Sequence, residues 1–131
     1  MRVMVFVKAT EDSEKGVDFS DPRMQKMMDD MGRFNDELEQ AGIMVTCGGL
    51  QESAKGKRVA FDGASRTVID GPFDHVRSLD TGFWIWDVKD MDEAVAWVKR
   101  CPNPMHGPSE IEIRPFHELG NPKSSLQSNE V

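Results

Sequence analysis

The chain has 131 residues, enough for one domain that buries roughly two-thirds of the surface exposed by its unfolded form. Its net charge of −7 argues against a nucleic-acid partner, because binding to phosphates needs clustered Lys and Arg. No apolar run approaches the roughly 20 residues that a membrane span requires, so we expect no membrane partner.

The N-terminal residues and the cysteines indicate the compartment. Residues 1–8 contain a short apolar run but no small-residue cleavage site of the signal-peptide kind, so we expect a cytoplasmic protein. The two cysteines, Cys47 and Cys101, have no metal-type spacing and are expected to be free thiols in that reducing compartment. We expect each to be a small buried side chain; the alternative is a reactive thiol.

The first third of the chain predicts a strand, a loop and a long helix. Residues 2–8 are apolar on both faces, as in a central strand covered on both sides. Residues 9–21 are acidic and form a loop. The helix begins with Asp21 as N-cap and Pro22 at its first position, and Gly42 ends it. We expect its apolar stripe to pack onto a sheet, the alternative being a partner groove; the stripe comprises Met24, Met27, Met28, Met31, Phe34, Leu38 and Ala41.

The middle of the chain is predicted to consist of strands. Residues 43–46 form a short strand, which residues 47–49 break. Residues 58–61 and 66–69 pair as a hairpin whose loop is longer than the tightest two-residue type. Residues 83–88 form the next strand.

The last third predicts a helix, a rigid loop and a strand. Asp90 caps the helix, and Glu93 three residues later gives the Asp-x-x-Glu form of a capping box. Prolines make residues 101–108 a rigid loop, and residues 110–114 form a strand with one solvent-exposed face. The inner face of the helix is predicted to comprise Met91, Ala94, Val95, Trp97 and Val98.

This order of elements predicts an α+β fold, the ferredoxin-like sandwich, in which two helices cover one face of an antiparallel sheet of four or five strands. The domain comprises residues 1–117, and the polar tail, residues 118–131, is expected to be disordered. An exposed apolar patch normally marks an interface, so we expect a homodimer whose sheets pack face to face. The uncovered face draws its apolar side chains from Met4, Phe6, Phe83, Trp84, Ile85 and Trp86.

Asp70 ends a β-branched run and precedes a Gly-Pro turn, which we expect to bring His75 within its reach. A carboxylate that orients an imidazole gives a general base, so Asp70 and His75 are the candidate catalytic residues. The alternatives are a turn in which Asp70 accepts backbone N–H bonds and a plain surface position for His75. Arg77 is a candidate for binding a substrate carboxylate, the alternative being a surface ion pair.

Three further residues complete the candidate substrate-binding set. Trp84 and Trp86 point to one face of a strand, where they stack on an aromatic ligand or, alternatively, fill the core. His106 lies in the proline-bounded loop. The three histidines, His75, His106 and His117, lack the spacing of a metal site, and no phosphate loop or dinucleotide fingerprint is present, so we expect neither metal nor cofactor.

Several segments in this order resemble the YCII-related superfamily and, within it, the branch named for its Asp-Gly-Pro-Phe (DGPF) motif. The resemblance covers nearly the whole chain and implies a ferredoxin-like fold assembled as a dimeric α+β barrel. Some relatives look like small lyases or isomerases that act on products of aromatic-ring breakdown, and others are encoded beside extracytoplasmic-function sigma factors. The matching segments are 32–38, 41–42, 49–50, 55–59, 68–73, 82–84, 91–95 and 100–102.

The chain also departs from the pattern of this branch. The branch has a glutamate where this chain has His75, a lysine at Arg77 and a second glutamate at Ser78. It also has Gly-Glu-Gly-Leu where residues 47–50 read Cys-Gly-Gly-Leu. Two acidic positions expected to flank the cleft are therefore absent.

Two functions are compatible with these residues. The first is a small cytosolic enzyme that transfers a proton, as an isomerase or lyase does, on a small organic acid. Asp70 and His75 would move the proton and Arg77 would bind the anion. The alternative is a non-catalytic homodimer that binds a ligand or a regulatory protein, in association with sigma-factor-type regulation.

Overall fold

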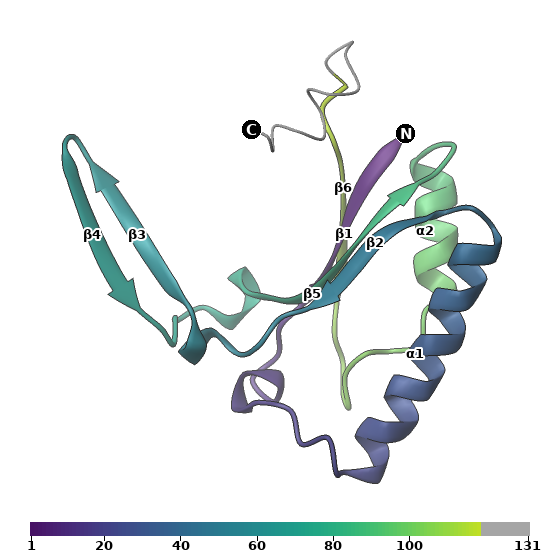
Figure 1. Cartoon of the computed structure of the whole chain (residues 1–131), viewed down its shortest axis with the longest axis horizontal. Coiled ribbons are helices and arrows are strands. Elements are labelled where there is room, and N and C mark those ends of the chain that lie inside the picture. The colour runs from purple at the N-terminus through teal and green to yellow at the C-terminus, as the bar shows by residue number, and fades with distance from the viewer. Residues whose placement is uncertain (119–131) are drawn as a thin grey trace.

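The computed structural model describes residues 1–118 and has a ferredoxin-like α+β fold with one added hairpin (Figure 1). From residue 119 on, the predicted tail lies outside the described residues. In the described part, no helix is both long and apolar enough to cross a membrane. In chain order, with η for short 3₁₀ helices, the elements are β1 (Arg2–Lys8), η1 (Ser13–Lys15), α1 (Pro22–Gln40), β2 (Met44–Gly49), η2 (Ser53–Lys55), β3 (Lys57–Asp62), β4 (Ser65–Asp70), η3 (Val76–Ser78), β5 (Asp80–Asp87), α2 (Met91–Arg100) and β6 (Ile111–Pro115).

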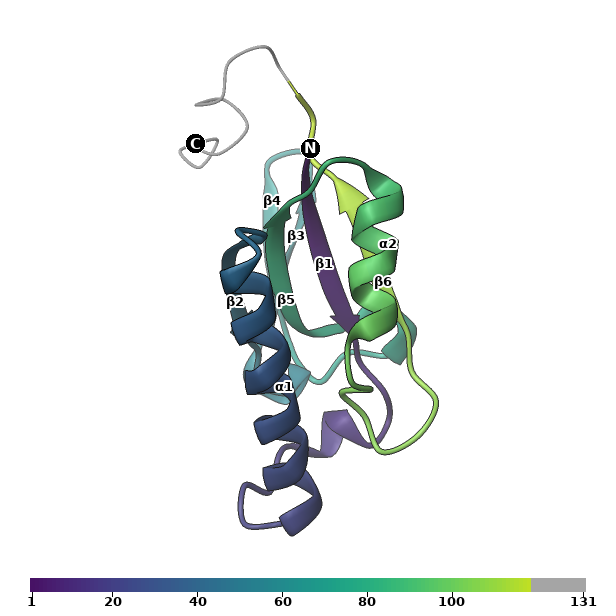
Figure 2. The same ribbon diagram turned by 90° about the vertical axis from the view of Figure 1, so that its right-hand side faces the viewer.

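Four strands form the main sheet in the order β2-β5-β1-β6, and every neighbouring pair is antiparallel. Both helices lie on the same face of this sheet (Figure 2). The strand order and the placement of the helices confirm the predicted ferredoxin-like fold. They also leave the second face of the sheet without a helix.

The central strand β1 shows the two faces of the sheet. Its side chains alternate between buried positions and positions that are only partly buried. Register pairs Met4 with Ile85 and Phe6 with Phe83 on the side away from the helices. We call this side the open face, because its apolar side chains are only partly buried within the single chain.

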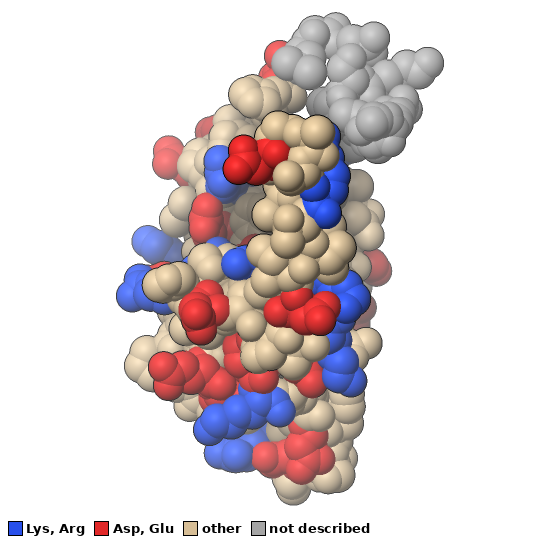
Figure 3. Space-filling model, turned by 90° about the vertical axis from the view of Figure 1, so that its left-hand side faces the viewer, with Lys and Arg blue, Asp and Glu red and all other residues tan. Residues whose placement is uncertain are grey.

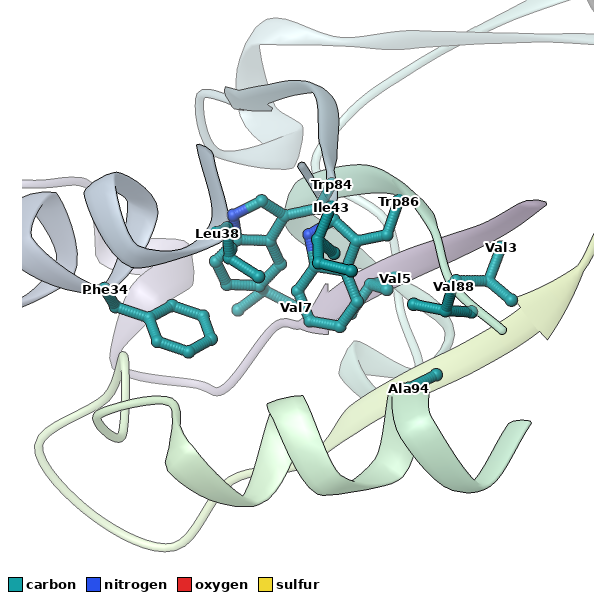
Figure 4. Packing of buried hydrophobic residues seen from close by; sticks show 10 residues of the cluster. All are labelled: Val3, Val5, Val7, Phe34, Leu38, Ile43, Trp84, Trp86, Val88 and Ala94. Atoms are coloured by element: carbon teal, nitrogen blue, oxygen red, sulfur yellow. The ribbon is translucent and has the colours of Figure 1, made fainter. Parts of the chain in front are cut away.

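The core fills the space between the main sheet and the helices (Figure 4). Trp84 and Trp86 are 4% and 0% exposed and pair across β1 with buried valines, so they lie on the helix side and not on the open face. The Phe34 ring meets both edge-on, with ring centroids 6.0 and 6.4 Å apart. The Trp84 indole N–H donates to Asn35 Oδ1 at 2.8 Å. The rest of the buried cluster comprises Val3, Val5, Val7, Leu38, Ile43, Val88 and Ala94.

The predicted ends of α1 are confirmed. Asp21 caps the helix, since its Oδ1 accepts a hydrogen bond from the Arg23 N–H at 2.9 Å, and Pro22 is the first helical residue. After the last turn, Gly42 adopts a left-handed conformation with φ of 73°.

The prediction that the apolar stripe of α1 packs onto the sheet is confirmed for the middle of the stripe and wrong for its ends. Phe34 and Leu38 are buried and Met31 contacts the core, but Met28 is 49% exposed. The reason is length: the 19 residues of α1 span about 28 Å and the seven of β1 about 23 Å. The first turns of α1 therefore extend past the end of the sheet (Figure 2). The stripe residues outside the core cluster are Met24, Met27, Met28 and Ala41.

Two other local predictions are also wrong. β2 continues through residues 47–49 and is not broken there, because Gly48 gives room to the Phe83 ring of β5, which would lie 3.0 Å from a Cβ at that position. In α2, the cap at Asp90 is confirmed, with Oδ1 accepting from the Glu93 N–H at 2.9 Å. Val95, predicted on the inner face, is 37% exposed, since the sheet lies nearer the Ala94 side of the helix.

The cysteines differ from one another. Cys101, after α2, is partly buried as predicted, and this burial raises the pKa of its thiol to about 12. Cys47 is exposed, so the prediction that it is buried is wrong. Cys47 lies on the edge strand β2, which has a neighbouring strand on one side only. It follows an irregularity in the register of β2 between Met44 and Thr46.

The strands β3 and β4 form a separate two-stranded sheet, which we call the arm. The predicted hairpin is thus confirmed, but its loop is the tight two-residue type and not a longer one. Asp62 and Ser65 are the last paired residues, and Gly63 between them has φ of 56°, a value that glycine adopts without strain. The arm projects away from the main sheet on the side opposite the helices (Figures 1 and 2).

Candidate functional site

The Asp-Gly-Pro-Phe motif forms the base of the arm. Asp70 is the last residue of β4, and its Oδ1 accepts a hydrogen bond from Lys57 Nζ of β3 at 2.5 Å. The Gly71 N–H donates to the carbonyl of Gly56 at 3.0 Å, closing the turn below the arm. Both side chains of the Lys57–Asp70 pair are mostly exposed, so the pair contributes little to stability.

Ser53 joins this base to the N-terminal loop. Its backbone N–H donates to Glu14 Oε2 at 3.0 Å, and its hydroxyl donates to the other carboxylate oxygen of Glu14. The same hydroxyl accepts from the Phe73 N–H at 3.1 Å. Gly71 lies so close to Ser53 that a Cβ would meet the Ser53 carbonyl oxygen at 1.8 Å. Ser53 is not recognisable from the sequence, because its partners Glu14 and Phe73 are 39 and 20 positions away in the chain.

The structure does not join the two candidate catalytic residues. Among residues 1–118, no hydrogen bond or ion pair links Asp70 to His75, and the Asp70 carboxylate binds Lys57. His75 precedes η3, with an exposed side chain and a left-handed backbone of φ 60°. Its carbonyl accepts hydrogen bonds from the N–H and the hydroxyl of Ser78, at 2.8 and 2.7 Å.

Arg77, on η3, borders a cleft of about 310 Å³ at the end of β1, which we call the Arg77 cleft. Its guanidinium binds the carboxylate of Glu110 at 3.1 Å, and both side chains are exposed. Lys8, also at this cleft, donates to Asp80 at 2.7 Å, and this hydrogen bond raises the pKa of Lys8. Lys8 therefore stays positively charged. The cleft is lined by Lys8, Ala9, Thr10, Val76, Arg77, Pro108, Ser109 and Glu110.

The other candidate residues lie elsewhere. The rings of Trp84 and Trp86 are in the core, and neither lines the Arg77 cleft. His106 is exposed in the proline-bounded loop. The structure therefore brings Arg77 to a cleft and does not bring the indoles or His106 there.

The chemistry of the described residues is that of an exposed polar site. None of the polar or charged side chains of residues 1–118 is buried within the single chain, and the thiol whose pKa burial raises, that of Cys101, does not line the Arg77 cleft. In the same residues, no group of three His, Cys, Asp or Glu side chains is placed to hold a metal ion. The Arg77 cleft holds two cations, Lys8 and Arg77, each of which is paired with a carboxylate in the single chain, and the Arg77 guanidinium is a group that binds planar carboxylates.

The comparisons with known proteins give a family. A search of curated proteins finds no match to the chain. The sequence model of the YCII-related domain matches residues 1–117, which covers the whole ferredoxin-like fold, the arm and the Arg77 cleft. With a match that includes every described helix and strand, this chain belongs to the YCII-related domain family.

Proposed function

We propose that the protein is a homodimer that binds a small organic acid in the Arg77 cleft. The observation that carries this proposal is the position of Arg77 at a cleft of about 310 Å³, together with Lys8. Pockets for small molecules begin at about this size and fix their ligands with a few polar groups. On a chain of net charge −7, this cleft brings two cations together, and it favours an anion once the ligand displaces Glu110 from Arg77.

The Arg77–Glu110 ion pair can exchange for a ligand. The two side chains are 81% and 66% exposed, and exposed ion pairs contribute about 1 kcal/mol or less. A ligand carboxylate can therefore replace that of Glu110 at low cost and bind the guanidinium through two parallel hydrogen bonds. Lys8 is held in place by Asp80, and its charge lies at the same cleft.

The open face supports the homodimer. Its apolar centre, formed by β1 and β5, is left uncovered in the single chain. Equal numbers of cations and anions border it, so two copies can meet there without the repulsion expected from a chain of charge −7. The bordering ion pairs are Arg2–Asp87, Lys8–Asp80 and Arg114–Glu112.

Two finer assignments accompany this proposal. The Asp-Gly-Pro-Phe sequence at residues 70–73 and its structured turn support membership of the DGPF-motif branch. The free thiols of Cys47 and Cys101 support a reducing, cytoplasmic location.

Substitution of Arg77 by Gln is expected to weaken binding of benzoate by about tenfold, because a charge-assisted hydrogen bond to the carboxylate is lost. Titration calorimetry of the wild type and the variant measures this change, with phenol as the uncharged probe of the same ring. Arg33→Gln is the matched control, since Arg33 is an exposed arginine paired with Asp30 on α1. Equal benzoate affinity in Arg77→Gln and the wild type would contradict the proposed site.

One observation favours proton transfer as a second candidate function. The backbone of His75 has a left-handed conformation, which residues other than glycine rarely adopt. Residues in such conformations cluster at functional sites. It lies two residues before Arg77 in the chain and directly before Val76, which lines the Arg77 cleft.

If His75 transfers a proton, the wild type will exchange the α-hydrogen of muconolactone for deuterium in heavy water, and His75→Gln will do so about a hundredfold more slowly. Proton NMR of the lactone follows this exchange, and Asp70→Asn shows whether the Asp70 carboxylate assists. Binding without any exchange by the wild type would leave the protein a binding protein alone.

A further inference from the structure

The arm carries an apolar face that is largely exposed in the single chain, with only the Arg66 guanidinium lying over the Phe61 ring, 4.3 Å from its centroid. Register places Val59 opposite Val68 and Phe61 opposite Arg66, so the three apolar side chains share one face of the hairpin. Val59 is 50% exposed, Val68 is 59% exposed and Phe61 is 70% exposed. No residue of β3 or β4 is buried. A contiguous apolar face of this kind normally marks a contact surface.

The arm is also expected to be only marginally stable when it is surrounded by water. A two-stranded hairpin without a third strand or a covering element is marginally stable. Its attachment to the body is at the base, through the Gly71–Gly56 and Phe73–Ser53 hydrogen bonds and the Arg58 guanidinium 4.1 Å above the Phe73 ring. Contact with another molecule along its length would supply the missing cover.

Charge indicates that the other molecule is a second copy of this chain. The arm has three cations and two anions, a net charge of +1, which leaves −8 on the rest of a chain of −7. A basic arm and an acidic body are complementary between two copies, and a two-fold axis satisfies both contacts at once. Figure 3, viewed from the side that bears the arm, shows both signs of charge interspersed.

The position of the arm agrees with this partner. It stands on the open-face side of the main sheet, diverging from the sheet toward its tip (Figure 1). A second copy docked on the open face would lie on the side where the arm projects. We therefore propose that the β3–β4 arm clasps the second copy of the homodimer, with Val59, Phe61 and Val68 packed on its body.

This inference rests on the proposed homodimer, and its test separates the two. Phe61→Ser is expected to raise the dimer dissociation constant by about tenfold or more, since a phenyl ring loses its burial. Met28→Ser is the matched control, an exposed apolar side chain on α1. Phe6→Glu, in the middle of the open face, tests the sheet-to-sheet contact itself. Sedimentation equilibrium at micromolar concentration gives all three constants.

The outcomes are distinct. A wild type that is monomeric at these concentrations would overturn both the homodimer and the clasping arm. If Phe6→Glu separates the dimer and Phe61→Ser leaves its dissociation constant unchanged, the proposed homodimer stands and the clasp is overturned. A dimer weakened by Phe61→Ser and unaffected by Met28→Ser supports the clasp.

Photo-crosslinking provides a second measurement. A benzophenone is attached to the cysteine of Ala64→Cys, in the loop of the arm, and is expected to crosslink the two copies. The variant also carries Cys47→Ser, which removes the exposed native thiol. The same probe at Gln40→Cys, on the last residue of α1, is the control. Crosslinks confined to the chain that carries the probe would overturn the clasp even if the mass is that of a dimer.

Discussion

Gly71→Ala is expected to lower the free energy of unfolding by about 2–3 kcal/mol. A Cβ at residue 71 would meet the Ser53 carbonyl oxygen at 1.8 Å and its carbon at 2.8 Å, and these are backbone atoms that no side-chain rotation can move. Relief requires the turn to shift, which breaks the Gly71–Gly56 and Phe73–Ser53 hydrogen bonds. Urea denaturation followed by tryptophan fluorescence measures the loss.

Gly56→Ala is the matched control in the same turn. A Cβ there would lie 3.5 Å from the same Ser53 oxygen and 3.9 Å from the Phe73 ring, which are ordinary contacts. We expect it to change the unfolding free energy by about 0.5 kcal/mol at most. Equal effects of the two substitutions would contradict the close approach of Gly71 to Ser53. Hydrogen exchange of the arm amides shows whether Gly71→Ala frees the arm before the core unfolds.

The fold could be predicted from the sequence because its elements are specified locally. The alternation of β1, the caps at Asp21 and Asp90, and Gly42 after α1 are each readable within a few residues. The wrong predictions concern contacts between elements that are distant in the sequence. The exposure of Met28 depends on where the sheet ends, and the exposure of Val95 depends on which side of α2 faces the sheet. The sequence of a helix alone predicts neither.

The candidate site was predictable only in part. Arg77 stands out in sequence as a cation after the motif, but its cleft is completed by Lys8 and Glu110, which are 69 and 33 positions away. Ser53 has no recognisable signal of its own in the sequence, since it is simply the first residue of the short 3₁₀ helix η2. The available signal was Gly71, since a glycine directly after a strand indicates a close approach by another backbone.

Phe34→Ala is expected to destabilise the protein by about 3–5 kcal/mol, the usual cost of deleting a buried phenyl ring. Phe34 is 3% exposed, and its ring meets Trp84, Trp86 and Trp97 edge-on, with centroids 6.0, 6.4 and 6.3 Å away. These aromatic pairs add to the cost of the cavity. Because α1 reaches the core mainly through Phe34 and Leu38, the loss also weakens the attachment of the whole helix.

Phe19→Ala is the control, because Phe19 is 65% exposed in the loop before α1. Its expected change is about 0.5 kcal/mol or less. Thermal unfolding at one fixed protein concentration keeps the contribution of dimerisation equal among the variants. A domain of this size is stable by about 5–15 kcal/mol, so Phe34→Ala removes a large share of the total. A loss below about 1 kcal/mol would mean that the three tryptophans close over the cavity, and that α1 is held chiefly by Leu38 and its neighbours.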